Sequence, residues 1–327
     1  MKSSVKKSLG IVVMALLLCL SGCGRQPVES GSATAENIPA ATPEELTVTQ
    51  ETLTLTPVET VTVTPEPAAQ PAADALFQTP CIDAPYDYEY SAADKQIAIR
   101  RFETDGITYF IADVQITNVS QFQTALSGGK PGGELETASA MAQRNGAVLA
   151  INADDYGVHK YGTIIRNGAL LRTHDTTRNM LIVDANGDFS VRVDRKNENP
   201  AQLGEELLAQ NVWQTFEFGP ELIRDGQAVT FSRDFDLIST KETRREPRTA
   251  IGQIGPLHYV IVVADGRQDG YSKGMTLTEL QDVLLACGAK TAMNLDGGGS
   301  AEMWFNGTVI NRPSGGKERK LSDILFF

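Results

Sequence analysis

The chain has 327 residues, 41% hydrophobic and 21% charged, so it is long and apolar enough to bury a core, and wholesale disorder is excluded. Its formal net charge is −12 and no long Lys/Arg run follows the first few residues, which argues against nucleic acid as a partner. The sequence has four cysteines without a Cys-x-x-Cys pair and three histidines, too few for a structural zinc site or a redox dithiol.

Residues 1–22 have the pattern of an export signal. Three lysines precede an apolar run from Leu9 to Leu20, which is shorter than the roughly 20 residues needed to span a bilayer. The run ends in Leu20-Ser21-Gly22-Cys23, which resembles the lipobox of bacterial lipoproteins, where the cysteine is diacylated and the preceding peptide removed. The alternative is an ordinary signal peptide with a chance cysteine. We expect a mature protein that begins at Cys23 and is lipid-anchored on the extracytoplasmic face of the cell membrane.

Residues 23–80 have the composition of a disordered stalk. From position 24 onward they contain eleven Thr, eight Pro, seven Glu and one Asp against a single basic residue, Arg25. Such a segment cannot offset its ordering entropy by burial. Short Thr-Val-Thr and Thr-Leu-Thr pieces resemble strands, but prolines interrupt them.

Residues 81–327 show no internal repeat and no second Pro/Thr-rich segment, so we expect one folded domain. Four turn dipeptides separate apolar runs and predict hairpins: Asn167-Gly168, Asn186-Gly187, Asp225-Gly226 and Asn306-Gly307. The expected strands are Ile97 to Phe102, Ile107 to Ile116, Ala147 to Asn152, Thr163 to Arg166, Met180 to Val183, Phe189 to Val193, Thr249 to Ile254, Tyr259 to Ala264, Thr291 to Leu295 and Ala301 to Phe305.

Two helices are expected among these strands. One begins after Thr276, which forms a capping box with Glu279, and it ends at Gly288. The other covers residues 134–144. A strand, helix, strand order from Tyr259 through Thr291 implies one crossover. The fold class is therefore α+β, with mixed, mainly antiparallel sheets.

The most informative stretch is Asn294-Leu295-Asp296-Gly297-Gly298-Gly299-Ser300. Successive glycines allow positive φ angles and let the N–H groups of Gly297, Gly298 and Gly299 converge on an anion, with Asp296 aimed at the same space. The functional interpretation is an anion site beside a carboxylate. The structural alternative is a glycine-rich hairpin with a capping Asp.

Other fragments would complement such a site. Arg presents a planar fork that matches phosphate bidentately, and it occurs in Arg248-Thr249 and Glu318-Arg319. Carboxylates and an amide follow another strand in Asn152-Ala153-Asp154-Asp155-Tyr156, and Asp265-Gly266-Arg267 adds a further pair. Taken singly, each fragment is equally well explained as solvated charge or loop polarity.

The cysteines and one acidic segment give weaker evidence of a functional site than the glycine-rich stretch does. Cys287 lies on the apolar stripe of the second helix and is expected to be core, while a Cys81–Cys287 disulfide is an option that the sequence leaves open. Asp184-Ala185-Asn186-Gly187-Asp188 begins like a calcium loop, but no Glu closes it, so a hairpin explains it better.

Taken together, the motifs resemble the phosphodiester glycosidase family. They are, in order, Ile151-Asn152, Phe218-Gly219-Pro220, Pro247-Arg248-Thr249-Ala250-Ile251-Gly252, Asp265-Gly266-Arg267, Tyr271-Ser272-Lys273-Gly274-Met275-Thr276, Glu279-Leu280, Ala292-Met293-Asn294-Leu295-Asp296-Gly297-Gly298-Gly299-Ser300, Asn311-Arg312-Pro313-Ser314 and Glu318-Arg319. The resemblance covers most of residues 145–327. The Asn152 motif departs from the usual Asn-Gly-Asp-Tyr, so the sequence does not tell which of Asp154 and Asp155 faces the site.

The resemblance implies hydrolysis of a sugar C1–O–P linkage in a glycan, wall polymer or glycoconjugate. The leaving group is a phosphate monoester, so the main demands are stabilisation of its growing charge and a carboxylate at the anomeric carbon. We assign Asp296 as nucleophile or base, with Glu318 or Asp154 as the second carboxyl. The expected binding residues are Asn152, Arg248, Thr249, Asp265, Arg267, Gly297, Gly298, Gly299, Ser300 and Arg319.

No metal or other cofactor is required by this scheme, although the acidic side chains leave room for a Ca²⁺ or Mg²⁺ ion. Two alternatives remain open. One is a non-catalytic lipoprotein that binds anionic cell-wall polysaccharide, and the other is a phosphodiesterase that cleaves P–O. A buried carboxylate beside the anion site favours catalysis, because it would repel phosphate in a simple binder.

Overall fold

The computed structural model describes residues 77–156, 160, 162–193, 195, 197–231 and 243–327, all within the unit Glu66–Phe327. The expected signal peptide, Cys23 and the stalk up to residue 76 lie outside the described residues. Gln78, expected in the stalk, instead belongs to the folded part, because its backbone N–H and C=O both bond to the side chain of Gln115, at 2.6 and 2.9 Å. Among the described residues, no helix is long and apolar enough to cross a membrane.

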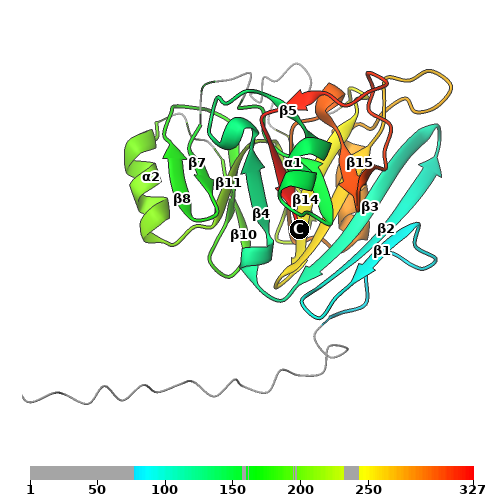
Figure 1. The fold of residues 1–327 in the computed structure, drawn as a ribbon, viewed down its shortest axis with the longest axis horizontal. Coiled ribbons are helices and arrows are strands. Elements are labelled where there is room, and N and C mark those ends of the chain that lie inside the picture. Colours follow the sequence, from blue (N-terminus) through cyan, green and yellow to red (C-terminus); the bar gives the residue numbers. More distant parts are fainter. Residues whose placement is uncertain (1–76, 157–159, 161, 194, 196, 232–242) are drawn as a thin grey trace, which may run out of the picture. The chain divides into compact units, whose positions relative to one another are not determined.

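The largest sheet is built from both halves of the domain (Figure 1). Its eight strands lie in the order β1 (Tyr88–Ser91), β2 (Lys95–Thr104), β3 (Ile107–Ile116), β15 (His258–Ala264), β14 (Arg248–Gly255), β16 (Thr291–Asn294), β12 (Glu221–Arg224) and β13 (Gln227–Ala228). Because β3 pairs with β15, the segment without recognisable motifs completes the sheet that carries the motifs.

Smaller sheets form a second layer. One has five strands, β18 (Thr308–Val309), β17 (Met303–Phe305), β6 (Leu149–Asn152), β20 (Asp323–Phe326) and β4 (Gln123–Leu126). Another has three, β10 (Phe189–Arg192), β9 (Asn179–Val183) and β11 (Gln214–Phe218). Two strand pairs complete the set, β19 (Lys320–Leu321) with β5 (Glu136–Thr137) and β7 (Ile164–Arg166) with β8 (Ala169–Arg172).

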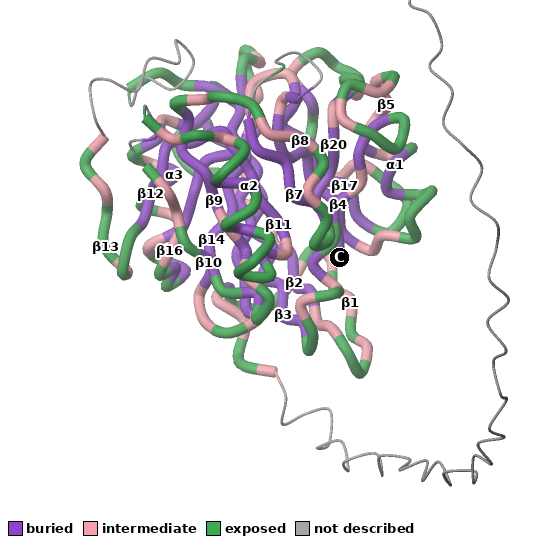
Figure 2. Tube along the Cα trace, turned by 90° about the vertical axis from the view of Figure 1, so that its left-hand side faces the viewer, coloured by how far each residue is buried: buried purple, intermediate pink, exposed green. Residues whose placement is uncertain are grey.

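The main core lies between the large sheet and this second layer. Alternate residues of β15 divide between two apolar clusters: Tyr259, Ile261 and Val263 face the layer of smaller sheets, while Val260 and Val262 face helix α3. Both faces of the central part of the large sheet are therefore buried, and Figure 2 shows β14 and β16 as largely buried. This two-sided burial explains the continuous apolar run of β15 from Tyr259 to Ala264, which differs from the alternating pattern of a sheet exposed on one face.

Three helices cover the outer faces of the sheets. α3 (Leu277–Ala286) has the expected capping box of Thr276 and Glu279 and packs Leu277, Leu280 and Leu284 on the large sheet. Each of these leucines contributes roughly 1.5–3 kcal/mol by burial. α1 (Ala138–Arg144) is shorter than expected, because Glu136–Thr137 form β5 and Thr137 is the N-cap. α2 (Pro200–Ala209) was not predicted, although Asn199 caps it and Pro200 occupies its first turn.

All four expected hairpins are present, and three of them have the two-residue loop of the expected type I′ turn. Asn167 and Gly168 have φ angles of +50° and +77° between β7 and β8, as a type I′ turn requires. Asp225-Gly226 and Asn306-Gly307 behave in the same way. Asn186-Gly187 also joins two antiparallel strands, but β9 ends at Val183 and β10 begins at Phe189, so the loop is longer.

The α+β class with mainly antiparallel pairing is confirmed. Every pairing between the strands that the structure describes is antiparallel. The crossover through α3 joins β15 to β16, which run in the same direction with β14 between them. This topology places the start of β14, at Arg248, beside the carboxyl ends of β15 and β16. Polar residues that are distant in the sequence meet there.

Candidate active site

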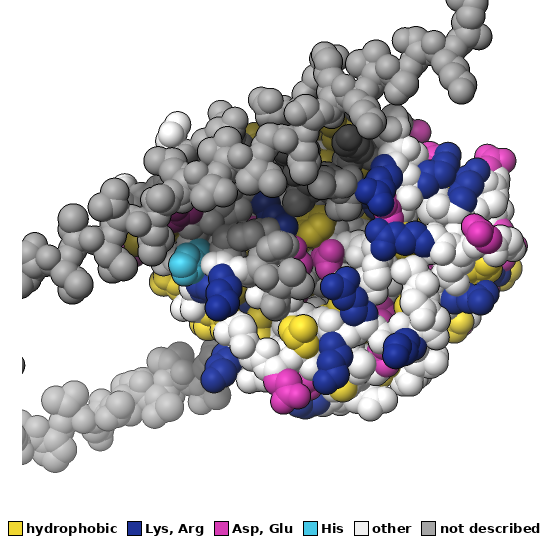
Figure 3. All heavy atoms as spheres, turned by 90° about the horizontal axis from the view of Figure 1, so that it is seen from above, with side chains coloured by type: hydrophobic (Ala, Val, Ile, Leu, Met, Phe, Trp, Pro, Cys, Tyr) yellow, Lys and Arg dark blue, Asp and Glu magenta, His cyan; other side chains and the backbone are white. Residues whose placement is uncertain are grey.

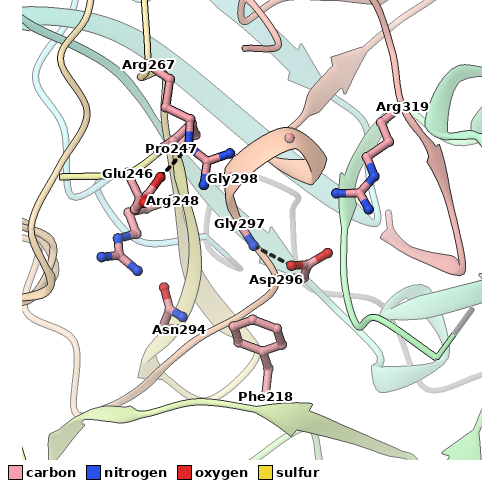
Figure 4. A pocket seen from close by; sticks show the side chains of 11 residues that line it. Phe218, Glu246, Pro247, Arg248, Arg267, Asn294, Asp296, Gly297, Gly298 and Arg319 are labelled. Carbon is pink, nitrogen blue, oxygen red and sulfur yellow. Dashed lines mark hydrogen bonds and ion pairs between the residues drawn. The ribbon is translucent and has the colours of Figure 1, made fainter. Parts of the chain in front are cut away.

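A pocket of about 190 Å³ opens at this meeting point of strand ends. It is smaller than the ~300–1,000 Å³ typical of drug-sized ligands and suits a group the size of one phosphate or one sugar ring. Its lining residues are Phe218, Glu246, Pro247, Arg248, Arg267, Asn294, Asp296, Gly297, Gly298, Gly299 and Arg319 (Figure 4). The pocket thus combines fragments that the sequence suggested separately.

Asp296 supplies the carboxyl that faces Arg319 across this pocket (Figure 4). Its Oδ1 accepts a hydrogen bond from the Gly297 N–H at 2.9 Å. Burial raises the pKa of Asp296 to about 7; the hydrogen bond from Ser300 and the charge of Arg319 oppose this rise, while the charge of Asp155 adds to it. A carboxyl that ionises near neutral pH can attack as a carboxylate or exchange a proton.

Asn152 holds the backbone of Asp296 in place. Its Nδ2 donates to the Asp296 carbonyl oxygen at 2.5 Å, and its Oδ1 accepts from the Thr249 hydroxyl at 2.7 Å and from the Glu302 N–H at 3.1 Å. Asn152 and Thr249 are both almost fully buried and do not line the pocket. Both were expected as binding residues; the structure places them behind the pocket, where they position the Asp296 loop.

The glycine loop does not form the three-donor anion nest expected from the sequence. The Gly297 N–H donates to Asp296 and the Gly298 N–H donates to the Pro247 carbonyl at 2.9 Å, so two of the three donors are already used. A Cβ atom at Gly297 would lie only 2.7 Å from that carbonyl oxygen. The glycines therefore serve close packing of the loop against the start of β14.

Arg248 is a buried cation at the back of the pocket. Its side chain is 3% exposed, and it donates from Nε to the Met275 carbonyl at 3.1 Å and from Nη2 to the Arg244 carbonyl at 2.9 Å. Burial lowers its pKa to about 10, so it stays charged at neutral pH. Beside it, buried Glu246 is ion-paired with Arg244 and Arg267.

Arg267 and Arg319 are the exposed cations of the pocket. Arg267 has a φ angle of +59°, a left-handed conformation that is uncommon for a residue with a side chain and is often found at functional sites. Arg319 donates from Nη1 to the Ser300 hydroxyl at 3.4 Å, which is a long hydrogen bond. Within the part of the chain that the structure describes, this is the one side-chain hydrogen bond of Arg319, so most of its donors remain available to an anion.

One face of the molecule is rich in basic groups. Figure 3 shows many Lys and Arg side chains, with acidic ones among them, on the face seen from above. A chain with a net charge of −12 therefore presents a locally basic surface. Such a surface attracts anionic substrates.

Four lining residues were not among the predicted site residues: Phe218, Glu246, Pro247 and Asn294. Asn294 is 1% exposed, donates from Nδ2 to the Gly219 carbonyl at 2.9 Å, and has an Oδ1 without a hydrogen-bond partner among the described residues. This unpartnered acceptor suits a ligand hydroxyl. Phe218 and Asn294 stand inside motifs of the family resemblance, so that signal was available.

Asp154 lies outside the pocket. Its carboxyl and that of Asp323 bind the same guanidinium nitrogen of Arg166, at 2.9 and 2.8 Å, in a fully buried triad. Asp155 instead binds Arg178, with Oδ1 at 2.7 Å and Oδ2 at 3.1 Å, and its charge acts on Asp296. Of the two adjacent aspartates, Asp155 is therefore the one electrostatically connected with the pocket.

Glu318 also lies outside the pocket lining. Its carboxylate accepts hydrogen bonds from the Ser139 N–H at 3.0 Å and hydroxyl at 2.6 Å. It faces Glu302, a buried residue missed in the sequence, whose pKa is raised to about 9 by burial and by the interaction with Glu318. Glu302 is therefore protonated at neutral pH, and the hydrogen bonds from Ser139 to Glu318 anchor the segment that carries Arg319 to α1.

Asp265 is likewise a supporting residue. Its Oδ1 accepts from Asn311 Nδ2 at 2.9 Å, and its Oδ2 accepts from the Tyr271 hydroxyl at 2.8 Å. It fixes the loop at residues 311–312 and does not line the pocket.

Among the described residues, no group of three or more His, Cys, Asp or Glu side chains is arranged to hold a metal ion.

The phosphodiester glycosidase family model matches residues 145–327, more than half of the chain. The chain belongs to the phosphodiester glycosidase family. Membership supports a hydrolase, and the matched region contains every residue that lines the pocket.

This phosphodiester glycosidase chain is similar to parts of longer proteins. It is 30% identical over 200 residues to the SPbeta prophage-derived uncharacterized protein YomE of Bacillus subtilis, covering 58% of this chain and 29% of that protein. It is 34% identical over 118 residues to human N-acetylglucosamine-1-phosphodiester alpha-N-acetylglucosaminidase, covering 33% of this chain and 21% of that protein. The matches thus span less than a third of these relatives.

A solved structure shares the fold. The catalytic domain of zebrafish N-acetylglucosamine-1-phosphodiester alpha-N-acetylglucosaminidase, auto-inhibited by its pro-peptide, superposes with a TM-score of 0.55 at 20% identity. The superposition covers 71% of this chain and 82% of that one. It therefore includes much of the segment before residue 145, in which no family motif was found.

Proposed function

We propose that this phosphodiester glycosidase hydrolyses the C1–O–P linkage of a sugar-1-phosphodiester. The observation that carries the proposal is the pairing of Asp296 with Arg319 across one small pocket. A carboxyl that ionises near pH 7 and a cation with available donors are the two groups that this reaction needs. A site that only bound phosphate would gain nothing from the carboxyl, because the two negative charges repel.

The expected mechanism divides the pocket into two sides. Arg319, Arg267 and buried Arg248 stabilise the phosphate as the C1–O bond breaks and negative charge grows on it. On the other side, Asp296 acts at C1 as nucleophile or as the base that activates water. Asn294 Oδ1 accepts a sugar hydroxyl, and Phe218 contacts the apolar face of the ring.

The negative charge of Asp155 affects when the Asp296 carboxyl ionises and how it can act. Asp155, held by Arg178, keeps a second negative charge near Asp296. This charge opposes ionisation of Asp296 in the free site and favours the positive charge that develops at C1 in the transition state. Neither Asp154 nor Glu318 lines the pocket, so we assign Asp155 as the electrostatic partner in their place.

Arg319→Ala is expected to lower kcat by about 10²–10³-fold and to raise KM, because it removes donors to the developing anion. The assay measures sugar release from a nucleotide sugar or a simpler sugar-1-phosphodiester. Lys317→Ala is the matched control: it removes one exposed positive charge two residues earlier, outside the pocket, and should leave turnover nearly unchanged.

Two outcomes would contradict the proposal. Hydrolysis in ¹⁸O-labelled water puts the label on the sugar if C1–O breaks, whereas label in the phosphate would identify a phosphodiesterase. Binding of anionic polysaccharide by a chain that releases no sugar from any diester would identify a non-catalytic binder.

We further propose that the enzyme acts outside the cytoplasm as a lipoprotein anchored through Cys23. The proposal rests on the Leu20-Ser21-Gly22-Cys23 sequence behind an apolar run. Cys23→Ala is expected to move the protein out of the membrane fraction or to leave its signal uncleaved. Mass spectrometry of the mature amino terminus checks this, and an unmodified first residue other than Cys23 would contradict it.

A further inference from the structure

Two cysteines far apart in the sequence meet on the outer face of the large sheet. The chain has four cysteines; Cys19 and Cys23 lie in the leader region, which leaves Cys81 and Cys287 for the domain. Cys287 is the C-cap of α3 and is buried. Cys81 is half-buried and packs against the same apolar cluster.

The side chains of these two cysteines interact directly. Both belong to the same apolar cluster, and their interaction there, together with burial, raises the pKa of Cys81. The Cys81 N–H donates to Asp113 Oδ2 at 2.7 Å, which fixes the backbone next to its thiol. The same Asp113 carboxylate binds His258 Nε2 at 2.8 Å, so the anchor point is itself held in a buried pair.

The backbone around Cys81 forms a strap over β3. Gln78 is bonded through both its N–H and its C=O to Gln115, and Cys81 is bonded to Asp113 two positions away on the same strand. Both acceptor side chains are buried on one face of β3. Specific hydrogen bonds therefore fix the position of the strap on the sheet. This fixed position holds the two sulfur atoms in place.

We propose that Cys81 and Cys287 form a disulfide that fastens this strap to the end of α3. The inference goes beyond the proposed hydrolase activity and does not depend on it. The thiolate of one cysteine attacks an external disulfide, forming a mixed disulfide and releasing one thiol. The thiolate of the other cysteine then attacks the sulfur of the first and displaces the second thiol. In total the two cysteines lose two electrons and two protons, and the external disulfide is reduced to two thiols.

The bond would close a very long loop, because the two cysteines are near opposite ends of the domain. Cross-links over long loops remove the most conformational freedom from the unfolded chain. For a domain of this size, we expect oxidation to raise the melting temperature by roughly 5–15 °C.

The test uses the full chain, purified in detergent and equilibrated either with excess oxidised glutathione or with excess reductant. Peptide mapping of the oxidised sample without reduction should show the Cys81 peptide joined to the Cys287 peptide, and the melting temperature should fall on reduction. Cys81→Ser is the matched control. It keeps the backbone hydrogen bond to Asp113 and should melt at the same temperature in both buffers.

The peptide map decides the proposal even if a serine variant does not fold. Full alkylation of both cysteines after oxidation, or Cys81 joined only to glutathione, would overturn it. A melting temperature of the wild-type chain that is the same in both buffers would overturn the stabilising role.

Discussion

Asp296→Asn should lower kcat by about 10²–10⁴-fold while leaving KM unchanged or lower. The change removes the carboxylate needed at C1 but keeps the size and shape of the side chain. It also removes a negative charge that repels a phosphodiester before reaction, so ground-state binding is expected to stay similar or tighten. Steady-state kinetics on a sugar-1-phosphodiester measures both effects.

The pH dependence gives an independent check on Asp296. Its pKa is about 7, and the nucleophile or base must be ionised, so kcat/KM of the wild-type chain should rise with pH through a midpoint near 7. Asp282→Asn, on the exposed face of α3, is the matched control and should keep both the rate and this midpoint. Near-normal turnover of Asp296→Asn would make Asp296 a structural residue.

Arg166→Met should be the most destabilising of the proposed changes. It leaves the buried carboxyls of Asp154 and Asp323 facing one another without their shared cation. Removing one partner of a buried ion pair typically costs about 3–5 kcal/mol of unfolding free energy. The Arg166 guanidinium also stacks over Phe216 at 4.6 Å from the ring centroid, a contact that methionine replaces only in part.

This loss should depend on pH. Burial raises the pKa of Asp154 to about 7, and that of Asp323 is raised as well. Carboxyls with raised pKa values favour the folded state below their unfolded pKa of about 4, and this contribution is lost as the pH rises through the folded value. Without Arg166 the folded pKa values rise further, so the deficit should be larger at pH 8 than at pH 5.

Chemical denaturation at the two pH values measures the deficit. Arg144→Met is the matched control, because it breaks an ion pair with Glu136 in which the two side chains are 45% and 25% exposed. Such a partly exposed pair contributes about 0–1 kcal/mol. If both variants lost the same stability at both pH values, the Arg166 triad would have no special role.

Local signals in the sequence predicted much of the fold. β3 was expected at Ile107 to Ile116 and is found there, because β-branched and aromatic residues dominate this segment. The start of α3 was predicted from Thr276 and Glu279, since a capping box is a short-range contact. α2 was not predicted because its buried stripe of Leu203 and Leu207 is narrow.

The site was predictable only where its residues are contiguous or belong to a motif. Asp296, Arg248 and Arg319 line one pocket as expected. The roles of Asn152 and Thr249 could not be predicted from the sequence. Packing between two sheets decides which side of a strand end faces the pocket. The same holds for Asp154, whose partner Asp323 follows it by more than 150 residues.

The strand order shows that the unit that folds is larger than the region that carries the recognisable motifs. Residues 145–327 carry the family match, yet β3 covers one side of β15 and β4 covers one side of β20. A fragment that began at residue 145 would expose the unpaired N–H and C=O groups of both strands as open edges. Open apolar edges recruit other chains and lead to aggregation. The protein should therefore not be truncated at residue 145, where the family match begins. The segment from Gln78 onward protects the edges of β15 and β20 from pairing with other chains.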